Sequence, residues 1–164
     1  MDKVIIDGAI ADNLWQRLEA DALESGVPAQ GKIIVPLAYW QENRDALIDR
    51  GDVAVWLAPG EEPKDLEDDL ASLPLVAIHF PAFKDGRGYS YARELRTRYG
   101  FKGEVRATGD VLRDQLFAMQ RCGFDAFALR EDQDAESALL AFSEFSEVYQ
   151  ASSDQTLPLF RRRD

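Results

Sequence analysis

Short apolar runs alternate with longer segments whose apolar residues recur at helical spacing, and this alternation limits the fold more than any other feature. The runs are rich in β-branched and aromatic residues, which favour strands. Four of the five are apolar throughout rather than at every second position, so both faces of these strands are predicted to be covered, whereas residues 104–107 are a weaker strand candidate that contains two charged residues. The five expected strands are residues 33–35, 53–57, 75–78, 104–107 and 126–129.

The segments between these runs predict helices that connect parallel strands. Two parallel neighbours need a long crossover, which is usually a helix. The expected helices are residues 37–50, 61–73, 90–99, 111–122 and 135–149. The fold class is therefore α/β, with a mostly parallel sheet of about five strands. An open, flavodoxin-like sheet is favoured. The alternative is a (β/α) barrel, which could only be partial because eight units need roughly 250 residues.

One α/β domain is predicted over residues 1–150, followed by a C-terminal arm over 151–164. Within the domain, residues 4–6 are expected to form an edge strand and residues 13–23 a helix. The N-terminus lacks the basic start and apolar stretch of a signal peptide, and no window approaches a membrane span. A cytoplasmic location without membrane contact is expected. The single cysteine, Cys122, is predicted to be a buried structural thiol that forms no intramolecular disulfide.

The charge is unevenly distributed. A formal net charge of −11 argues against general binding to nucleic acid. Residues 84–121 nevertheless carry nine basic and five acidic side chains. This basic segment is compatible with a small anion or an acidic partner, and equally with arginines that form solvated pairs on helix surfaces.

The segment 86–90 is the candidate anion-binding loop. Its glycines allow a close approach of the backbone, the following helix begins with free N–H groups, and Arg87 offers a forked donor. The alternative is a tight structural turn before the helix. The segment matches neither GxGxxG nor the phosphate-binding P-loop, so no cofactor is identified. The predicted anion-binding residues are Arg87, Gly88, Ser90 and Arg130.

His79 and Asp110 are the candidate catalytic residues, because each follows or ends a predicted strand. Histidine and aspartate both serve as general acids and bases. The alternatives are a packed, hydrogen-bonded histidine and an N-cap aspartate. With one histidine and one cysteine, no metal site is predicted. Parallel topology should bring His79, Asp110, Arg87 and Arg130 to one edge of the sheet. Arg106, inside an expected strand, needs a partner.

Several stretches resemble a bacterial family known as domain of unknown function 934. They are IVPL at 34–37, FPAFKDGRGYS at 80–90, GEVRATGDVLRDQL at 103–116 and RCGFDAF at 121–127, within a likeness spanning about residues 33–150. Typical members have threonine where this chain has Lys84. Members are commonly labelled probable oxidoreductases of sulfite reduction, a label that reflects neighbouring genes and brings no catalytic residues with it.

The resemblance implies a cytoplasmic role in sulfur assimilation. The first hypothesis is an accessory protein of assimilatory sulfite reduction that contacts the reductase or its electron donor. The alternative is an enzyme or sensor, with an oxidoreductase or a flavin protein among its forms, that binds a small anion at the 86–90 loop. Whether the chain is an enzyme stays open at this point.

Overall fold

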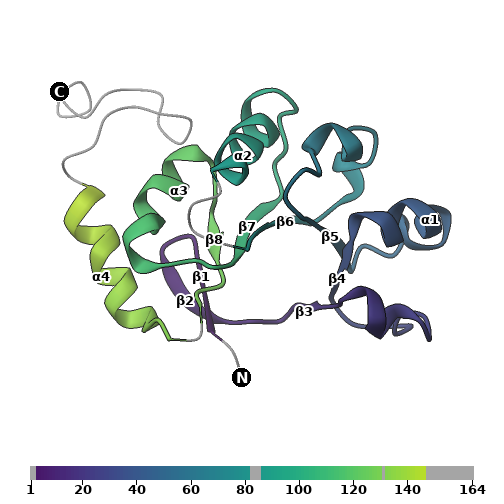
Figure 1. The fold of residues 1–164 in the computed structure, drawn as a ribbon, viewed down its shortest axis with the longest axis horizontal. Coiled ribbons are helices and arrows are strands. Elements are labelled where there is room, and N and C mark those ends of the chain that lie inside the picture. Colours follow the sequence, from purple (N-terminus) through teal and green to yellow (C-terminus); the bar gives the residue numbers. More distant parts are fainter. Residues whose placement is uncertain (1–2, 82–85, 131, 147–164) are drawn as a thin grey trace.

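The computed structural model describes residues 3–81, 86–130 and 132–146, without the side chains of 141–146. Within these residues the chain forms eight strands and four α-helices, and Figure 1 shows their arrangement. The strands are β1 (Lys3–Ile6), β2 (Ala9–Asp12), β3 (Gln16–Arg17), β4 (Ile33–Pro36), β5 (Val53–Leu57), β6 (Leu75–Phe80), β7 (Glu104–Gly109) and β8 (Ala126–Phe127). The helices are α1 (Leu37–Leu47), α2 (Arg87–Thr97), α3 (Leu116–Cys122) and α4 (Ala135–Ser146).

All eight strands form one sheet in the order β2-β1-β8-β7-β6-β5-β4-β3. The five predicted strands, β4 to β8, are parallel neighbours in chain order, which confirms the mostly parallel α/β sheet. The prediction of about five strands is three short. Strands β1 and β2 form an antiparallel hairpin at one end, and β3 pairs with β4 at the other. Residues 4–6 do form a strand, but it lies between β2 and β8 instead of at the edge.

The sheet is curled into a half-barrel with the helices outside the arc (Figure 1). A strand order that never reverses keeps successive crossovers on one face of the sheet. The two ends of the sheet stay unpaired with each other, so the sheet is open, as expected. The flavodoxin-like order, which reverses at a switch point, is not the order observed. The architecture thus combines the open sheet with the curvature of the partial-barrel alternative.

The two faces of the sheet carry different cores. The convex face packs against the helices through a large cluster that includes Val55, Ile78 and Phe80. The alternate residues point to the concave face, where a small cluster of Ile34, Ala54, Leu75 and Ala77 packs against two partly buried tryptophans, Trp15 and Trp56. Strand residues alternate between faces, so the same short runs supply both cores.

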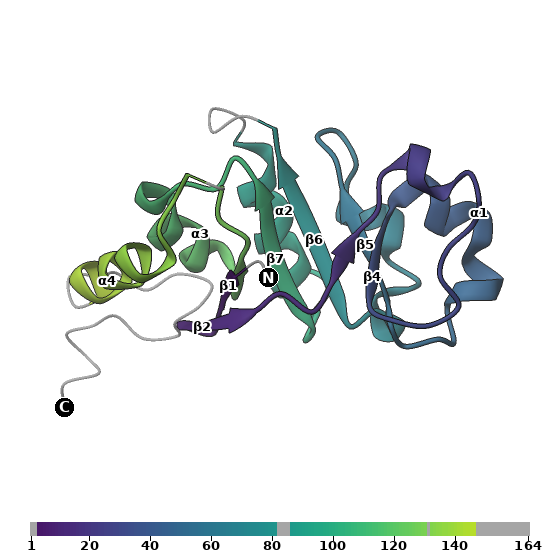
Figure 2. The ribbon, with the colours of Figure 1, turned by 90° about the horizontal axis from the view of Figure 1, so that it is seen from below.

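Residues 13–17, which we call the strap, follow β2, cross the concave side of the half-barrel and end in β3 (Figure 2). A helix over residues 13–23 was predicted and is wrong. Arg17 lies opposite Ile34 in the β3–β4 ladder, and only Ala20–Leu23 is helical, as a 3-10 turn. Arg106 Nη1 donates to Asn13 Oδ1 at 2.9 Å and Nε donates to Glu104 Oε2 at 2.7 Å. Arg106 therefore has the partners that its burial requires, and one of them holds the strap.

The crossover between β5 and β6 contains two short 3-10 helices, Pro63–Leu66 and Leu70–Ser72, where one helix over 61–73 was predicted. Buried Asp69 lies between them and accepts hydrogen bonds from Trp40 Nε1 (2.7 Å) and Arg44 Nε (2.5 Å) of α1. These bonds tie the crossover to α1 and compete with a continuous helix. The predicted helix 111–122 is likewise split into a 3-10 turn, Arg113–Gln115, and α3. The C-terminal arm lies outside the described residues.

Candidate functional site

A hollow of about 460 Å³ opens on the concave face, beside the carboxyl ends of β7 and β8. We call it the concave hollow. In parallel α/β folds, ligands bind outside the carboxyl ends of the strands, which makes this the expected side for a site. Among the residues that the structure describes, no acidic side chain lines it. Its lining is Asn13, Trp15, Arg17, Ile34, Arg106, Thr108, Gly109, Ala128, Leu129 and Arg130.

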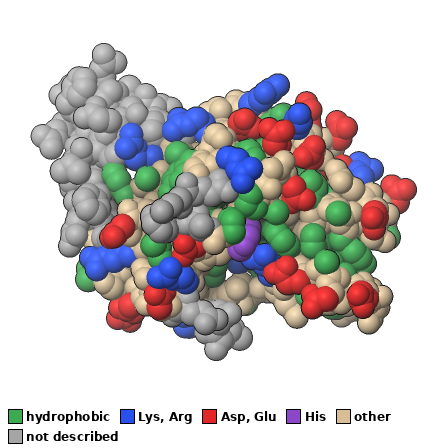
Figure 3. All heavy atoms as spheres, in the orientation of Figure 1, with side chains coloured by type: hydrophobic (Ala, Val, Ile, Leu, Met, Phe, Trp, Pro, Cys, Tyr) green, Lys and Arg blue, Asp and Glu red, His purple; other side chains and the backbone are tan. Residues whose placement is uncertain are grey.

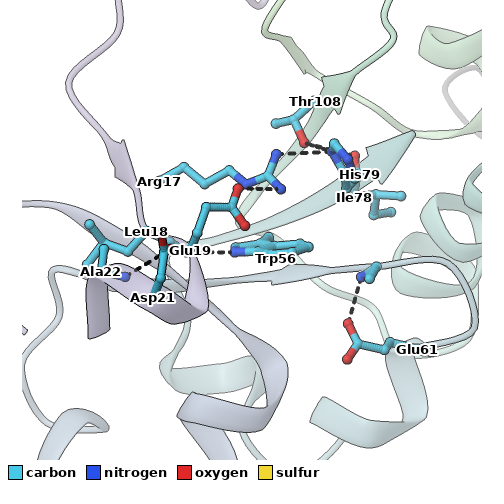
Figure 4. Close-up of polar contacts among 11 residues, drawn as sticks. Arg17, Leu18, Glu19, Asp21, Ala22, Trp56, Glu61, Ile78, His79 and Thr108 are labelled. Atoms are coloured by element: carbon cyan, nitrogen blue, oxygen red, sulfur yellow. Dashed lines mark hydrogen bonds and ion pairs between the residues drawn. The ribbon is translucent and has the colours of Figure 1, made fainter. Parts of the chain in front are cut away.

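Arg17 lines the hollow from β3, and three residues contact its guanidinium (Figure 4). Its guanidinium carbon lies 4.1 Å from the ring centroid of Trp56, a cation–π contact. Nη1 donates to His79, Nη2 lies 3.0 Å from Glu19 Oε1, and Nε is buried with no hydrogen-bond partner in the described part of the chain. Burial lowers the pKa of Arg17. Its one carboxylate partner, Glu19, is exposed.

His79 lies behind Arg17 and determines where that guanidinium sits. Arg17 Nη1 is 3.0 Å from His79 Nδ1, and arginine can only donate, so Nδ1 is the acceptor. The ring proton of neutral His79 therefore sits on Nε2. Burial, and then the charge of Arg17, lower the pKa of His79, so the ring is neutral near pH 7. The histidine is visible at the surface in Figure 3, as the purple side chain among hydrophobic and basic groups.

Thr108 and Gly109 form the floor beside His79. Thr108 stands opposite His79 in the β6–β7 ladder, and its Oγ1 lies 3.4 Å from His79 Nδ1. Gly109 has a φ of +89°, and a Cβ there would lie 2.3 Å from Phe80 O and 2.7 Å from His79 Cε1. Only glycine lets the end of β7 pass this close to the ring. Trp56 packs edge-on against His79 with a centroid distance of 5.7 Å.

Arg130 and Asp110 meet at the far end of the concave hollow as an ion cluster. Arg130 Nη1 donates to Asp110 Oδ1 at 2.7 Å, and its Nε and Nη2 bind both carboxylate oxygens of Asp132. The bonds to Asp132 and then Asp110 raise the pKa of Arg130, and the same pairing lowers the pKa of Asp132 to about 2. Asp110 is not an N-cap: Leu112 precedes the 3-10 turn and Gln115 precedes α3. Two carboxylates thus neutralise Arg130.

The 86–90 segment forms the start of α2 on the helix side of the sheet. A Cβ on Gly88 would lie 2.5 Å from the Phe80 ring, so this glycine lets α2 pack closely on β6. Ser90 Oγ donates to Arg87 O at 2.9 Å inside the first turn. Arg87 lies near the β5 loop, where a Cβ on Gly60 would be 3.8 Å from its Nη1. Residues 82–85 are outside the described part, and anion binding by Arg87, Gly88, Ser90 and Arg130 stays a prediction.

The predicted convergence holds in part. His79 and Thr108 face each other across β6 and β7, and Asp110 and Arg130 form an ion pair one step beyond. Arg87 shares a small hollow on the helix side with His79 but does not line the concave hollow. A catalytic role for His79 or Asp110 stays a prediction.

Cys122 is partly exposed, not buried as expected. Arg93 Nη2 lies 3.7 Å from its Sγ, because α2 and α3 pack side by side. Among the described residues, no group of three or more His, Cys, Asp or Glu side chains is placed to hold a metal ion. Within the same residues, no helix has both the length and the apolar character that crossing a membrane requires.

The strap residues Asn13, Trp15 and Arg17 are the functional candidates that sequence reasoning missed. They fell in the predicted helix over residues 13–23, far from His79 in the chain, so nothing placed them near that histidine. The available signal was Asn13-Leu14-Trp15-Gln16-Arg17, in which polar and apolar residues do not follow a helical stripe.

The fold and site define a class: a half-barrel α/β protein with a basic hollow on its concave face. A comparison with known families assigns the chain to one of them. The profile of the family described as bacterial protein of unknown function (DUF934) matches residues 54–160, and the chain belongs to this family. Searches of curated proteins and of solved structures find no match.

Proposed function

We propose that this protein binds a small anion in the concave hollow, with Arg17 as the principal cation. The observation that carries the proposal is the state of Arg17. Its guanidinium lines the hollow, is held in place by Trp56 and His79, and leaves Nε without a partner among the described residues. A prepositioned, partly desolvated guanidinium binds oxyanions through charge-assisted hydrogen bonds.

The ion pair that competes with a ligand, between Arg17 and Glu19, is weak. Glu19 is 58% exposed at its side chain, and an ion pair with so exposed a group is worth only about 0–1 kcal/mol. A ligand oxyanion can therefore displace Glu19 at little cost. Arg106 and Arg130 are instead paired with the less exposed carboxylates of Glu104 and Asp110, which offset their charge and leave Arg17 as the principal cation of the hollow.

The test is a titration of the full chain with sulfite, sulfate, phosphate and acetate, followed by calorimetry and by the melting temperature. We expect at least one anion to bind, and Arg17→Gln to weaken it about tenfold or more. Glu19→Gln should strengthen binding a few-fold, because it removes the competitor. Arg98→Gln, an exposed arginine stacked on Tyr99, is the matched control and should bind as the wild type does.

The same titration separates this site from the 86–90 loop. Arg87→Gln should leave anion binding unchanged if the concave hollow is the site. Loss of binding in Arg87→Gln with full binding in Arg17→Gln would move the site to the loop and contradict our proposal. Absence of binding by every anion would contradict both.

The role in sulfite reduction rests on the family resemblance and remains a proposal. It makes sulfite the first ligand to titrate, and it proposes contact with the reductase or its electron donor. A pull-down from cells grown with sulfate as sole sulfur source tests that contact. Recovery of neither partner would count against the accessory role, whatever the anion titration shows.

A further inference from the structure

Given the proposed anion site, we infer that its ligand is an organic anion, with an apolar body beside Trp15, and not a free inorganic oxyanion. The inference deepens the proposed function and rests on it. Its basis is the size of the concave hollow and the chemistry of the wall next to Arg17.

The hollow is too large for an inorganic ion. Its volume of about 460 Å³ lies within the range of sites for small organic molecules, roughly 300–1,000 Å³. An ion the size of sulfite contacting Arg17 would leave most of that volume to water. A ligand that extends along the hollow can instead contact both the cations and the remaining wall.

That wall is apolar where it adjoins Arg17. Arg17 and Ile34 are register partners of β3 and β4, and Trp15 packs on the apolar cluster that contains Ile34. Trp15 is partly exposed and lines the hollow. Leu129 gives a second apolar contact across the hollow, beyond β8. Such surface next to a fixed cation suits a molecule with a charged end and an apolar body.

Hydrogen bonds within the strap fix the backbone position of Trp15. Trp15 N donates to Asn13 Oδ1 at 3.1 Å, and the same oxygen accepts from buried Arg106 at 2.9 Å. Trp15 also packs on the small apolar cluster of the concave face, and Lys32 Nζ lies over its ring, 5.6 Å from the centroid. The indole is therefore positioned before any ligand arrives, which reduces the entropy lost on binding.

The test compares matched probes that differ only in their apolar body: methyl phosphate with hexyl phosphate, methanesulfonate with hexanesulfonate, and acetate with hexanoate. For the preferred head group, we expect the hexyl probe to bind at least about tenfold more tightly than its short partner, because its chain buries apolar surface. Calorimetry on the full chain gives the ratio. Tryptophan fluorescence should change on binding and lose most of that change in Trp15→Phe.

Substitutions of Trp15 and Leu129 show where the apolar chain of the probe lies. Trp15→Ala should lower the hexyl-to-short ratio at least about threefold, and Trp15→Phe should keep most of it. Leu129→Ala provides an independent reading if Trp15→Ala fails to fold. Arg17→Gln should weaken both members of a pair to the same extent.

The outcomes are distinguishable. A ratio near one in the wild type, with binding that still depends on Arg17, overturns the organic ligand and leaves the anion site standing. A large ratio that survives both Trp15→Ala and Leu129→Ala places the apolar body elsewhere and also overturns the inference. Failure of every probe to bind in an Arg17-dependent way overturns the proposed function itself.

Discussion

At the scale of single residues, the site depends on three local contacts that hold one guanidinium. Trp56 supports the flat face of Arg17, His79 accepts from Nη1, and exposed Glu19 holds Nη2. Gly109 lets the neighbouring strand approach His79 closely enough to keep the ring in place. Each of these contacts can be tested separately by substituting the residue that makes it.

His79 should make stability depend on pH. Its folded pKa is lowered from 6.5, chiefly by burial. As the pH falls through 6.5, the unfolded chain takes up a proton that the folded chain resists, so stability is lost toward acid. Relative to His79→Gln, which cannot titrate, the wild type should lose stability between pH 6.5 and the lowered pKa of folded His79, by at most about 1.4 kcal/mol per pH unit.

Urea unfolding of both proteins at pH 7.5, 6.5 and 5.5 measures this difference. The chain has one histidine, so no other imidazole contributes. A difference that is constant with pH, or that favours the wild type in acid, would show that burial of the ring does not govern its titration.

Gly109→Ala should destabilise the fold strongly. The left-handed φ alone costs about 1–2 kcal/mol for an L side chain, and the new Cβ would meet Phe80 O and the His79 ring. Gly26→Ala is a matched control, since Gly26 has a φ of +91° and nothing within 4 Å of an added Cβ. We expect Gly109→Ala to cost about 1–3 kcal/mol more than the control in denaturant unfolding. Equal costs would mean that the overlap relaxes freely.

At the scale of elements, the polar residues that meet at His79 come from different parts of the sheet. Strands β6 and β7 supply His79 and Thr108 in register, whereas Arg17 comes from the two-residue strand β3 at the end of the strap, which pairs with β4. On the opposite face, α2 begins with close packing of Gly88 on Phe80. The start of α2 is therefore shaped by packing, and this accounts for one glycine of the predicted anion loop.

Gly88→Ala tests that packing role. In an open helical position, alanine is favoured over glycine by about 1 kcal/mol, but here a Cβ would overlap the Phe80 ring and Ile78. We expect destabilisation by about 1–3 kcal/mol. Gly86→Ala, whose added Cβ has no described atom within 4 Å, should be near neutral. Thermal unfolding of the two variants gives the comparison, and a stabilised Gly88→Ala would refute the packing role.

At the scale of the whole molecule, the half-barrel needs both ends of its sheet. The family match begins at residue 54, inside β5, yet β4 pairs with β5 and β1 pairs with β8. Buried Ile5 and Val35 belong to the same core as the matched strands. The N-terminal third thus completes a core that the matched segment shares.

A fragment of residues 54–160 should not fold on its own. Without β4 and α1, the β5 edge and its buried face would be open to water, and β8 would lose β1. We expect no cooperative thermal transition and no near-ultraviolet dichroism, with the full chain as the control. A cooperative transition in the fragment would show that the matched segment is an independent domain.

The strand runs and most helix positions were predictable from sequence. Each run buries both faces, so its composition is set by a local requirement that a short window can reveal. The 3-10 turns around Asp69 were not predictable, because a tertiary contact with Trp40 and Arg44 overrides the helical spacing. The sequence also indicated the carboxyl ends of the strands as the place for a site, which put His79 and Asp110 among the candidates.

Only the tertiary structure decided which polar groups meet. Arg17 and His79 are 62 positions apart, and Arg106 and Asn13 are 93 apart. No local pattern specifies such pairs, because they depend on the order and curvature of the sheet and on the path of the strap. By itself, the sequence determined a mostly parallel α/β sheet, since burial acts residue by residue. The hollow and its cation arise from chain segments brought together by curling, and this is a property of the complete fold.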